Sequence, residues 1–312
     1  MKLKKPKFWD YKKPNIISYI LWPISFFLQI INILKNLSSS EKKFHKIKTI
    51  CVGNIYIGGT GKTTLSKKIF EILQSKNIKS CFVKKYYKDQ KDEQKILENT
   101  GKLFKLYERK QSLKKAINEN FKVAIFDDGL QDKSIKYDLS FVCFNDLNFI
   151  GNGMTIPSGP LRENINNIRR FDYIFLNGNM KNNQNIKNEI MKIHSAAKIF
   201  EARYIPTNLK EFDSKEKYFV FSGIGNHGTF ISMLRENNLN VVEDIEFPDH
   251  YNYSQNDLSK IIKISKEKNL KILTTEKDFI RLKTNLDEIK FIKIKLEILN
   301  EENFLETLKI YE

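Results

Sequence analysis

Cysteine, histidine and proline are scarce in this chain of 312 residues. It contains three cysteines, four histidines and seven prolines. Cys51, Cys81 and Cys143 lie far apart in apolar segments, and the histidines show no metal-ligand spacing. These residues suit neither a disulfide framework nor a zinc site, and they are typical of a protein in a reducing compartment.

Nucleic-acid-binding signatures are also absent, although the chain is basic. The formal net charge is +17, from 54 Lys and Arg against 37 Asp and Glu. The lysines are spread along the chain rather than gathered in one tract, and neither an RNA-binding signature nor a zinc-finger spacing is present. A basic balance can also favour an anionic membrane or an acidic ligand. The sequence therefore predicts no nucleic-acid partner.

Charge is missing from one long apolar segment near the N-terminus. No charged residue occurs between Lys13 and Lys35, and residues 15–34 would form a helix of about 30 Å, near the thickness of a bilayer core. Its polar residues share one narrow stripe at helical spacing: Asn15, Ser18, Ser25, Gln29 and Asn32. A signal peptide, a spanning helix, a helix in the membrane interface and a soluble core helix are the alternatives. We favour a membrane-associated helix within residues 1–36 and leave spanning or interfacial placement open.

A glycine-rich turn follows a short apolar segment and precedes a helical pattern. Strand, turn and helix start in this order build a phosphate cradle, because backbone N–H groups and the helix dipole converge on the anion. The predicted nucleotide-binding residues are Gly58, Gly59, Thr60, Gly61, Lys62, Thr63 and Thr64. Lys62 would reach the β- and γ-phosphates, and the Thr63 hydroxyl would bind Mg²⁺. Tyr56 occupies the position where the usual pattern has its first glycine.

Strand and helix patterns alternate through the rest of the chain. The predicted strands are Thr49–Val52, Ser80–Val83, Leu103–Tyr107, Val123–Phe126, Leu139–Phe144, Tyr173–Leu176, Ile199–Tyr204, Tyr218–Ser222, Val241–Ile245 and Ile272–Thr274. This alternation predicts an α/β fold: a phosphate-loop NTPase-like core with a mostly parallel sheet at residues 37–212, and a second, smaller α/β domain at residues 213–312. Ser254 is expected to cap a helix from Gln255, and the polar segment Asn179–Asn188 is expected to be a loop.

Two carboxylates end the predicted strand at Val123–Phe126. In an open α/β sheet ligands bind beyond the carboxyl ends of the strands, so Asp127 or Asp128 can hold the Mg²⁺ that bridges the β- and γ-phosphates. Arg162 could clamp a phosphate, and His250 could transfer a proton. Taken singly, Arg162 resembles a solvated loop residue and His250 a surface histidine.

Several motifs in a fixed order resemble the tetraacyldisaccharide 4′-kinase family, the lipid A 4′-kinases. The matching segments are Val52-Gly53-Asn54 with the phosphate loop, Asp127-Asp128-Gly129-Leu130-Gln131, Gly159-Pro160-Leu161-Arg162-Glu163, Gly223-Ile224-Gly225, Phe247-Pro248-Asp249-His250 and Thr274-Thr275-Glu276-Lys277-Asp278. The resemblance covers nearly the whole chain. The family also has a residue other than glycine where Tyr56 stands. It has Ser-Arg-Gly-Tyr where this chain has Lys84-Lys85-Tyr86-Tyr87, and usually a histidine where this chain has Asp132.

The resemblance implies transfer of the γ-phosphate of ATP, with Mg²⁺, to the 4′-hydroxyl of a tetraacyldisaccharide 1-phosphate at the cytoplasmic face of the inner membrane. It implies a catalytic Asp, for which Asp92 in Lys91-Asp92-Glu93-Gln94 is the best match, with His250 as its partner. By itself Asp92 belongs to a solvated charge run. Lys62 and Arg162 complete the expected catalytic set. A GTP-binding switch, a partitioning-type ATPase and a membrane-anchored nucleotide sensor are the rivals. The sequence leaves any protein partner unidentified.

Overall fold

The computed structural model describes residues 5–37, 41–87, 91–178, 183–282 and 287–309, and within these ranges it contains two β-sheets. The larger sheet has eight strands, in the spatial order β12 (Ile294–Ile298), β7 (Lys198–Pro206), β6 (Tyr173–Gly178), β5 (Leu139–Asn145), β1 (Lys48–Gly53), β4 (Val123–Asp127), β2 (Ser80–Lys85) and β3 (Leu103–Leu106). All neighbours run parallel except β12, which lies antiparallel to β7. The predicted α/β fold with a mostly parallel sheet is confirmed.

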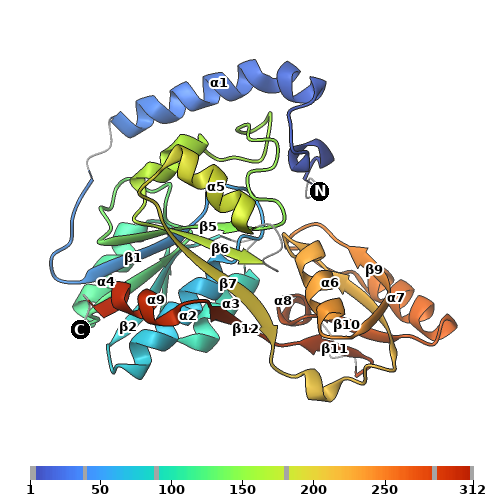
Figure 1. Cartoon of the computed structure of the whole chain (residues 1–312). Helices are drawn as coiled ribbons and strands as arrows, with labels where there is room; N and C mark the ends of the chain where they lie inside the picture. The colour runs from blue at the N-terminus through green and yellow to red at the C-terminus, as the bar shows by residue number, and fades with distance from the viewer. Residues whose placement is uncertain (1–4, 38–40, 88–90, 179–182, 283–286, 310–312) are drawn as a thin grey trace.

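The smaller sheet has four parallel strands. Their spatial order is β11 (Ile289–Ile292), β10 (Lys271–Thr275), β8 (Lys217–Ser222) and β9 (Asn240–Glu246). It forms a separate lobe beside the larger sheet (Figure 1). Each apolar run predicted as a strand forms one, because strands of a parallel sheet are buried on both faces and consist of near-continuous apolar residues.

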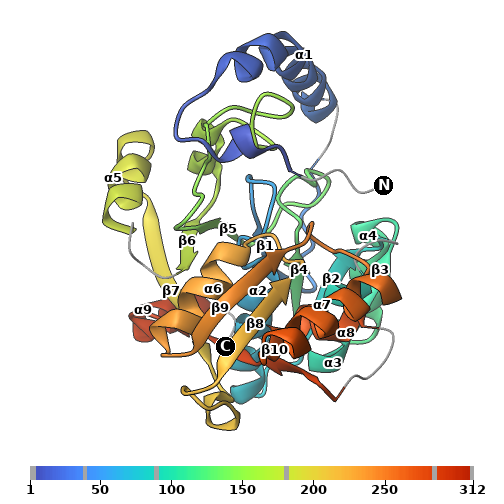
Figure 2. The same cartoon turned by 90° about the vertical axis from the view of Figure 1, so that its right-hand side faces the viewer.

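Helices cover both sheets. Their bounds are α1 (Ile16–Leu37), α2 (Lys62–Ser75), α3 (Lys91–Thr100), α4 (Arg109–Asn118), α5 (Asn183–Ile193), α6 (His227–Glu236), α7 (Gln255–Glu267), α8 (Glu276–Arg281) and α9 (Glu301–Leu308), with short 3₁₀ helices at Lys7–Asp10, Ile165–Arg170 and Leu209–Glu211. Helices α6 and α7 pack on opposite faces of the smaller sheet, and Figure 2 shows this lobe from the front. Ser254 caps α7 through a complete capping box, as predicted.

Two expectations for local structure are corrected. The polar segment Asn179–Asn188 is expected to be a loop, but α5 begins at Asn183, while residues 179–182 lie outside the described part of the chain. Ile186 and Ile190 of α5 are buried against the larger sheet, and this apolar stripe stabilises a helix whose first turn is polar. Residues 91–94, interpreted from sequence as a solvated charge run, begin α3.

The chain crosses between the two sheets twice, at adjacent places. After β7 it passes into the smaller lobe, and after β11 it returns to the larger sheet as β12, followed by α9. The two crossings are hydrogen-bonded: Thr207 N donates to Lys293 O at 2.9 Å, and Lys293 N donates to Asn208 Oδ1 at 2.9 Å. The division at residue 212 remains a proposal. The topology adds that β12 belongs to the larger sheet and that α9 packs against it.

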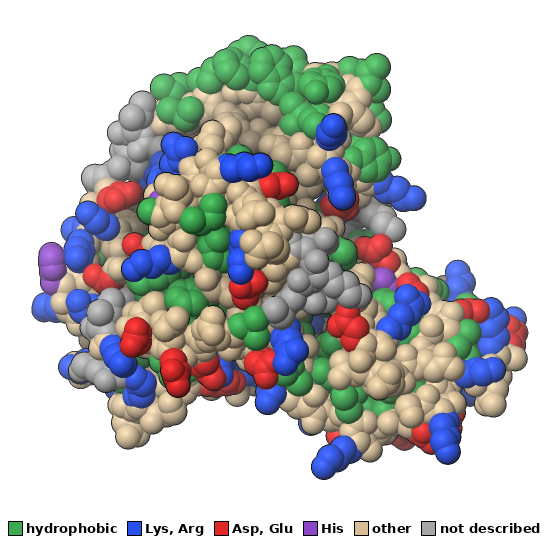
Figure 3. Space-filling model, in the orientation of Figure 1, with side chains coloured by type: hydrophobic (Ala, Val, Ile, Leu, Met, Phe, Trp, Pro, Cys, Tyr) green, Lys and Arg blue, Asp and Glu red, His purple; other side chains and the backbone are tan. Residues whose placement is uncertain are grey.

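Helix α1 lies across the larger lobe with its apolar face outward (Figures 1 and 3). Only 11% of its most apolar window is buried, and residues such as Ile16, Ile20 and Phe27 are 65–75% exposed. By length and composition, α1 could cross a bilayer. Ser18 and Ser25 of its polar stripe face the protein instead and are buried, while Asn32 at the far end of the stripe is exposed. The soluble core-helix alternative therefore does not fit, because a core helix buries its apolar side chains.

Candidate active site

The glycine-rich turn joins β1 to α2 at the carboxyl edge of the larger sheet. Gly61 caps α2 with φ of +78°, a conformation that favours glycine. A Cβ at this position would lie 2.4 Å from the Tyr204 hydroxyl oxygen and 2.5 Å from Asn177 Nδ2. Asn177 also donates to the Thr60 carbonyl. Neighbouring strands therefore hold the turn closely, and its N–H groups precede a helix start suited to an anion.

A turn of the smaller lobe packs directly on the glycine-rich turn. Gly225 lies between β8 and α6, and a Cβ there would stand 2.1 Å from the Gly59 backbone nitrogen. A Cβ at Gly59 would lie 3.1 Å from the Gly225 carbonyl carbon. Backbone meets backbone here with no room for a side chain, so the phosphate loop has walls from both lobes.

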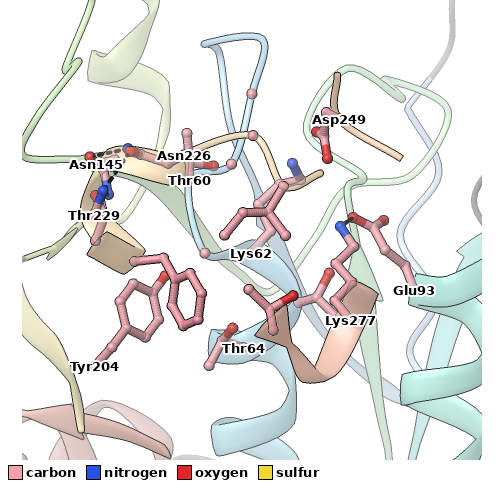
Figure 4. A pocket seen from close by; sticks show the side chains of 18 of the residues that line it. Thr60, Lys62, Thr64, Glu93, Asn145, Tyr204, Asn226, Thr229, Asp249 and Lys277 are labelled. Carbon is pink, nitrogen blue, oxygen red and sulfur yellow. Dashed lines mark hydrogen bonds and ion pairs between the residues drawn. The ribbon is translucent and has the colours of Figure 1, made fainter. Parts of the chain in front are cut away.

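A cavity of about 410 Å³ opens over the phosphate loop between the lobes. This volume lies within the ordinary range for small-molecule sites. Lys62, Glu93 and Lys277 meet near one end, while Tyr204 and the Asn145–Asn226–Thr229 group lie on the other side (Figure 4). Further apolar lining comes from Phe230, Met233, Ile292 and Ile294. The cavity therefore has a charged part and an apolar part.

Asp127 ends β4 beneath the start of α2. The Thr63 hydroxyl lies 3.3 and 3.4 Å from its two carboxylate oxygens, and Ser66 Oγ lies 3.3 Å away. Lys84 Nζ is 2.5 Å from Asp127 Oδ2 and 2.7 Å from Glu93 Oε2. Burial lowers the pKa of Lys84, but the two carboxylates outweigh this effect and raise it above the usual value.

Asp128 adopts a left-handed conformation, with φ of +62°. Arg162 NH1 lies 2.8 Å from Asp128 Oδ1, while Arg109 donates to the Asp128 backbone carbonyl and pairs with Asp132. Burial raises the pKa of Asp128, but the charges of Lys62, Arg162 and Lys84 outweigh it and lower the pKa to about 2. Asp128 is thus held as an anion at the cavity wall.

Oxygen donors of the kind that Mg²⁺ prefers gather at this edge. They are the Thr63 hydroxyl and the Asp127 and Asp128 carboxylates. Among the described residues no group of three or more His, Cys, Asp or Glu side chains could hold a metal alone. Mg²⁺ usually takes one or two carboxylates and completes its shell with phosphates and water, so this small donor set fits the ion.

Asp92 and His250 meet across the two lobes. His250 Nδ1 lies 3.0 Å from Asp92 Oδ1, and Arg281 NH2 lies 2.5 Å from Asp92 Oδ2. Burial raises the pKa of Asp92, but the His250 hydrogen bond and the Lys277 and Arg281 charges outweigh it and hold the pKa well below its usual range. The side chain of Asp92 is 4% exposed and that of His250 16%, so interpretation of either as a solvated surface residue is wrong.

A second ion pair joins α3 to α8 beside the first. Lys277 Nζ lies 2.9 Å from Glu93 Oε1. The two side chains point toward each other in Figure 4. Burial raises the pKa of Glu93, but Lys277, Lys84 and Lys62 outweigh it and hold the pKa well below the usual value. Glu93 therefore links the smaller lobe to Lys84 and Asp127 of the larger one.

Comparison with known proteins agrees with this geometry. The family model described as tetraacyldisaccharide-1-P 4′-kinase, LpxK, matches residues 17–311. A tetraacyldisaccharide 4′-kinase of Pelagibacter ubique is 55% identical over 99% of this chain and 98% of its own length, and one of Rickettsia bellii is 34% identical over 98% and 97%. The chain belongs to the tetraacyldisaccharide 4′-kinase family. A crystal structure of Aquifex aeolicus LpxK in complex with ATP shares the fold, with a TM-score of 0.70 and 23% identity over 95% of this chain.

The structure of this 4′-kinase brings together most residues expected from the sequence. The cavity is lined by Lys62, Arg162, Asp128 and His250 together with the whole turn from Gly58 to Thr64. Asp127 lies just beneath, in contact with Thr63. Asp92 reaches the cavity through His250. The catalytic and ligand-binding roles of these residues remain predictions.

Sequence reasoning misses several charged residues of the 4′-kinase site. Glu93 stands beside Asp92 and could have been noticed for that reason. Lys84 carries a weaker signal, since a lysine at the carboxyl end of a buried strand has no water around it. Arg281 gives none, because it follows an ordinary helix pattern and only the meeting of two lobes brings it to Asp92.

Proposed function

We propose that this chain catalyses the reaction of its family: transfer of the γ-phosphoryl group of ATP to the 4′-hydroxyl of a tetraacyldisaccharide 1-phosphate, the step that forms lipid IVA. One observation carries this proposal. A cavity between two lobes is lined both by a glycine-rich phosphate loop with its lysine and by a histidine bonded to a buried carboxylate. The first feature suits a triphosphate, and the second suits a hydroxyl that must lose a proton.

The two parts of the cavity suggest how ATP lies. The triphosphate would follow the N–H groups of residues 58–64, with Lys62 at the β- and γ-phosphates. The adenine would lie in the apolar part, against the rings of Tyr204 and Phe230. Aromatic faces stack well on a purine and contribute without strict hydrogen-bond geometry.

Thr63, Asp127 and Asp128 would hold Mg²⁺. When bound, the ion would neutralise charge that develops on the β- and γ-phosphates. Lys84 pairs with Asp127 and helps to orient its carboxylate toward Thr63. Arg162, paired with Asp128, supplies a planar cation at the same wall that can turn to a phosphate or to the sugar head group.

Asp92 would accept the proton of the 4′-hydroxyl. As the sugar oxygen bonds to the γ-phosphorus, the bond to the β–γ bridging oxygen breaks and ADP leaves. Asp92 takes the proton either directly or through His250, whose ring contacts both Asp92 and the cavity. Because Arg281 and His250 stabilise the anion, Asp92 is unprotonated at neutral pH; the same stabilisation makes it a weaker base, so the proton would move only as the sugar oxygen bonds to phosphorus.

Helix α1 would hold the kinase on the cytoplasmic face of the inner membrane. Its large exposed residues are apolar, Ser18 and Ser25 of its polar stripe are hydrogen-bonded to the protein, and lysines flank it on both sides. A helix that lies in the membrane interface accounts for this arrangement, since a spanning helix would have to leave those polar contacts. The acylated acceptor would then enter the cavity from the bilayer surface.

The test is transfer of labelled γ-phosphate from ATP to the disaccharide 1-phosphate by the purified protein with Mg²⁺. We expect product from the wild type, and none above background from Lys62→Ala, because the triphosphate loses its main cation. Lys95→Ala, on the exposed side of α3, is the matched control and should remain active. Undiminished transfer by Lys62→Ala would refute the proposal.

The base assignment has its own test. Asp92→Asn should lower kcat by about 10²- to 10⁴-fold with little change in the KM for ATP. His250→Gln should lower kcat less, and the double variant should be little worse than Asp92→Asn, since the two groups act as a unit. Glu98→Gln, an exposed carboxylate on the same helix, serves as the control. An Asp92→Asn enzyme with normal kcat would exclude Asp92 as the base.

A further inference from the structure

Tyr56 is an unusual residue at the start of the phosphate loop. It stands where the common pattern has a glycine, and only 2% of its surface is exposed. Its ring lies against the loop: a Cβ at Gly58 would be 3.0 Å from Tyr56 Cε1. The Tyr56 carbonyl accepts a hydrogen bond from Asn54 Nδ2 at 2.6 Å. The position of this ring therefore helps to set the path of the loop.

The hydroxyl of Tyr56 is held by the segment that leads into α1. It donates to Asp10 Oδ1 at 2.6 Å, and Lys5 Nζ lies 2.7 Å from the same oxygen and 3.0 Å from the hydroxyl. Burial raises the pKa of Tyr56, and Asp10 raises it further, so the hydroxyl stays protonated and donates. A charge-assisted bond of this kind is about twice as strong as a neutral one.

The loop at residues 152–162 makes a second connection between α1 and the phosphate loop. On one side Ser25 Oγ donates to Thr155 O at 2.9 Å and lies 2.8 Å from Ser158 Oγ. On the other side Ile57 N donates to Pro160 O at 2.9 Å, and Arg162 N donates to Ile55 O at 2.7 Å. Helix α1 and the nucleotide-binding turn thus share one support.

A lipid surface would favour the docked position of α1. If α1 left the protein within a bilayer, the Ser25 hydroxyl would lose Thr155 and Ser158, and the Ser18 hydroxyl would lose the Asn152 amide, in an apolar medium that offers no replacement. In water the same hydroxyls would be solvated, and the apolar face is exposed whether or not the helix is docked. Contact with lipid therefore shifts the N-terminal segment toward the state in which Asp10 holds Tyr56.

We propose that contact of α1 with an anionic bilayer orders the phosphate loop through the Asp10–Tyr56 hydrogen bond, so that lipid and nucleotide strengthen each other's binding. Tyr56 acts as a positioning residue, and the proposal rests on the proposed nucleotide-binding and membrane-binding functions. By linkage, vesicles must raise nucleotide affinity by the same factor by which nucleotide raises vesicle affinity. Couplings of this kind typically change affinity about 5- to 150-fold.

The experiment measures binding rather than turnover. Equilibrium dialysis gives the Kd of a radiolabelled, non-hydrolysable ATP analogue with and without vesicles of phosphatidylglycerol and phosphatidylethanolamine. We expect vesicles to lower the wild-type Kd at least about fivefold. For Asp10→Asn and for Tyr56→Phe the Kd should be nearly the same with and without vesicles, although both variants still sediment with them. Tyr107→Phe, at a 75% exposed tyrosine, should behave as the wild type.

Each result of the dialysis and sedimentation experiments either supports or refutes the proposed coupling. If the wild-type Kd is unaffected by vesicles, or if Tyr56→Phe and Asp10→Asn keep the full effect, the coupling is refuted while nucleotide binding stands. If the wild type binds no nucleotide under either condition, the proposed function fails as well. Vesicle sedimentation with and without the analogue must give the same factor, and unequal factors also overturn the proposal. Both substitutions are small enough for thermal melting to verify folding.

Discussion

At the scale of single residues, the charge balance of the site depends on Lys84. Its side chain has no exposed surface, yet it contacts carboxylates from β4 and from α3. Burial alone favours a neutral amine, and the two neighbouring anions keep the ammonium form. A buried cation with two partners orients both of them. Lys84 therefore orients Asp127 and Glu93 at the phosphate loop before any ligand arrives.

Asp128 gives the stability of this kinase a pH dependence that can be measured. Its pKa falls from 3.8 to about 2 on folding. At any pH above the unfolded pKa, the anion therefore adds about 2 kcal/mol to the free energy of unfolding. This stabilisation is lost as the pH falls through the folded pKa. Asp128→Asn should lower the free energy of unfolding by about that amount at pH 7, and asparagine tolerates the left-handed backbone. Urea unfolding of both proteins, without metal, measures the difference.

The difference in the free energy of unfolding between the wild type and Asp128→Asn should narrow as the pH falls from 3.8 toward 2. It should stay constant between pH 5 and pH 8, because Asp128 is ionised in both states there. A gap that remains unchanged at low pH would show that asparagine disturbs packing rather than charge. Glu98→Gln, which changes an exposed carboxylate, should leave the free energy of unfolding within about 0.5 kcal/mol of the wild type.

At the scale of elements, the contact between two glycine turns joins the lobes. Gly225 approaches the Gly59 nitrogen so closely that any side chain must displace one turn. Gly225→Ala should weaken binding of an ATP analogue by about 1–3 kcal/mol through this overpacking, which raises the Kd by about 5- to 150-fold. Gly228→Ala is the control, since its Cβ would meet the flexible end of Leu147 at 3.0 Å and Asn226 Oδ1 only at an ordinary contact distance of 3.9 Å. Equal affinities for both variants would contradict the role of the contact.

Local sequence patterns predict helices and strands better than they predict which strands pair. Buried strands and the strand–turn–helix at Lys62 follow from neighbouring residues, so they are predictable without any knowledge of the rest of the chain. Helix α3 is missed because its polar face dominates a short sequence, and its buried Leu97 is a weak signal. The return of β12 to the first sheet depends on pairing with β7, some 90 residues away in the chain, and no local pattern records such a pairing.

At the scale of the whole molecule, buried charge joins the two lobes. Arg281 and Asp92 are 6% and 4% exposed, and they come from α8 and α3. Removal of Arg281 leaves Asp92 with only His250 and Lys277 as partners, and it leaves the buried Asp278 carboxylate without its arginine. Arg281→Met should therefore lower the free energy of unfolding by about 3–5 kcal/mol, measured by urea denaturation.

The double variant Arg281→Met with Asp92→Asn supplies the control for this effect. It removes both charges, so it should recover part of the lost stability, while its kcat should stay as low as that of Asp92→Asn. The loss of stability caused by Asp92→Asn is measured once in the wild type and once in Arg281→Met. If the two losses are equal, the two charges are not coupled. Arg235→Met, at an arginine 57% exposed on α6, should change stability by less than about 0.5 kcal/mol.

The paired crossings between the lobes limit how the kinase can open. Because the smaller lobe is attached through two neighbouring, hydrogen-bonded segments, it is an insertion held at both of its ends. The smaller lobe can therefore rotate about the axis through its two connections. The same connections resist rotation about other axes and prevent the lobe from moving away from the larger one. Entry of a large acceptor would then need only a hinge rotation, which separates Arg281 from Asp92 and, on closing, returns them to the same alignment in every turnover.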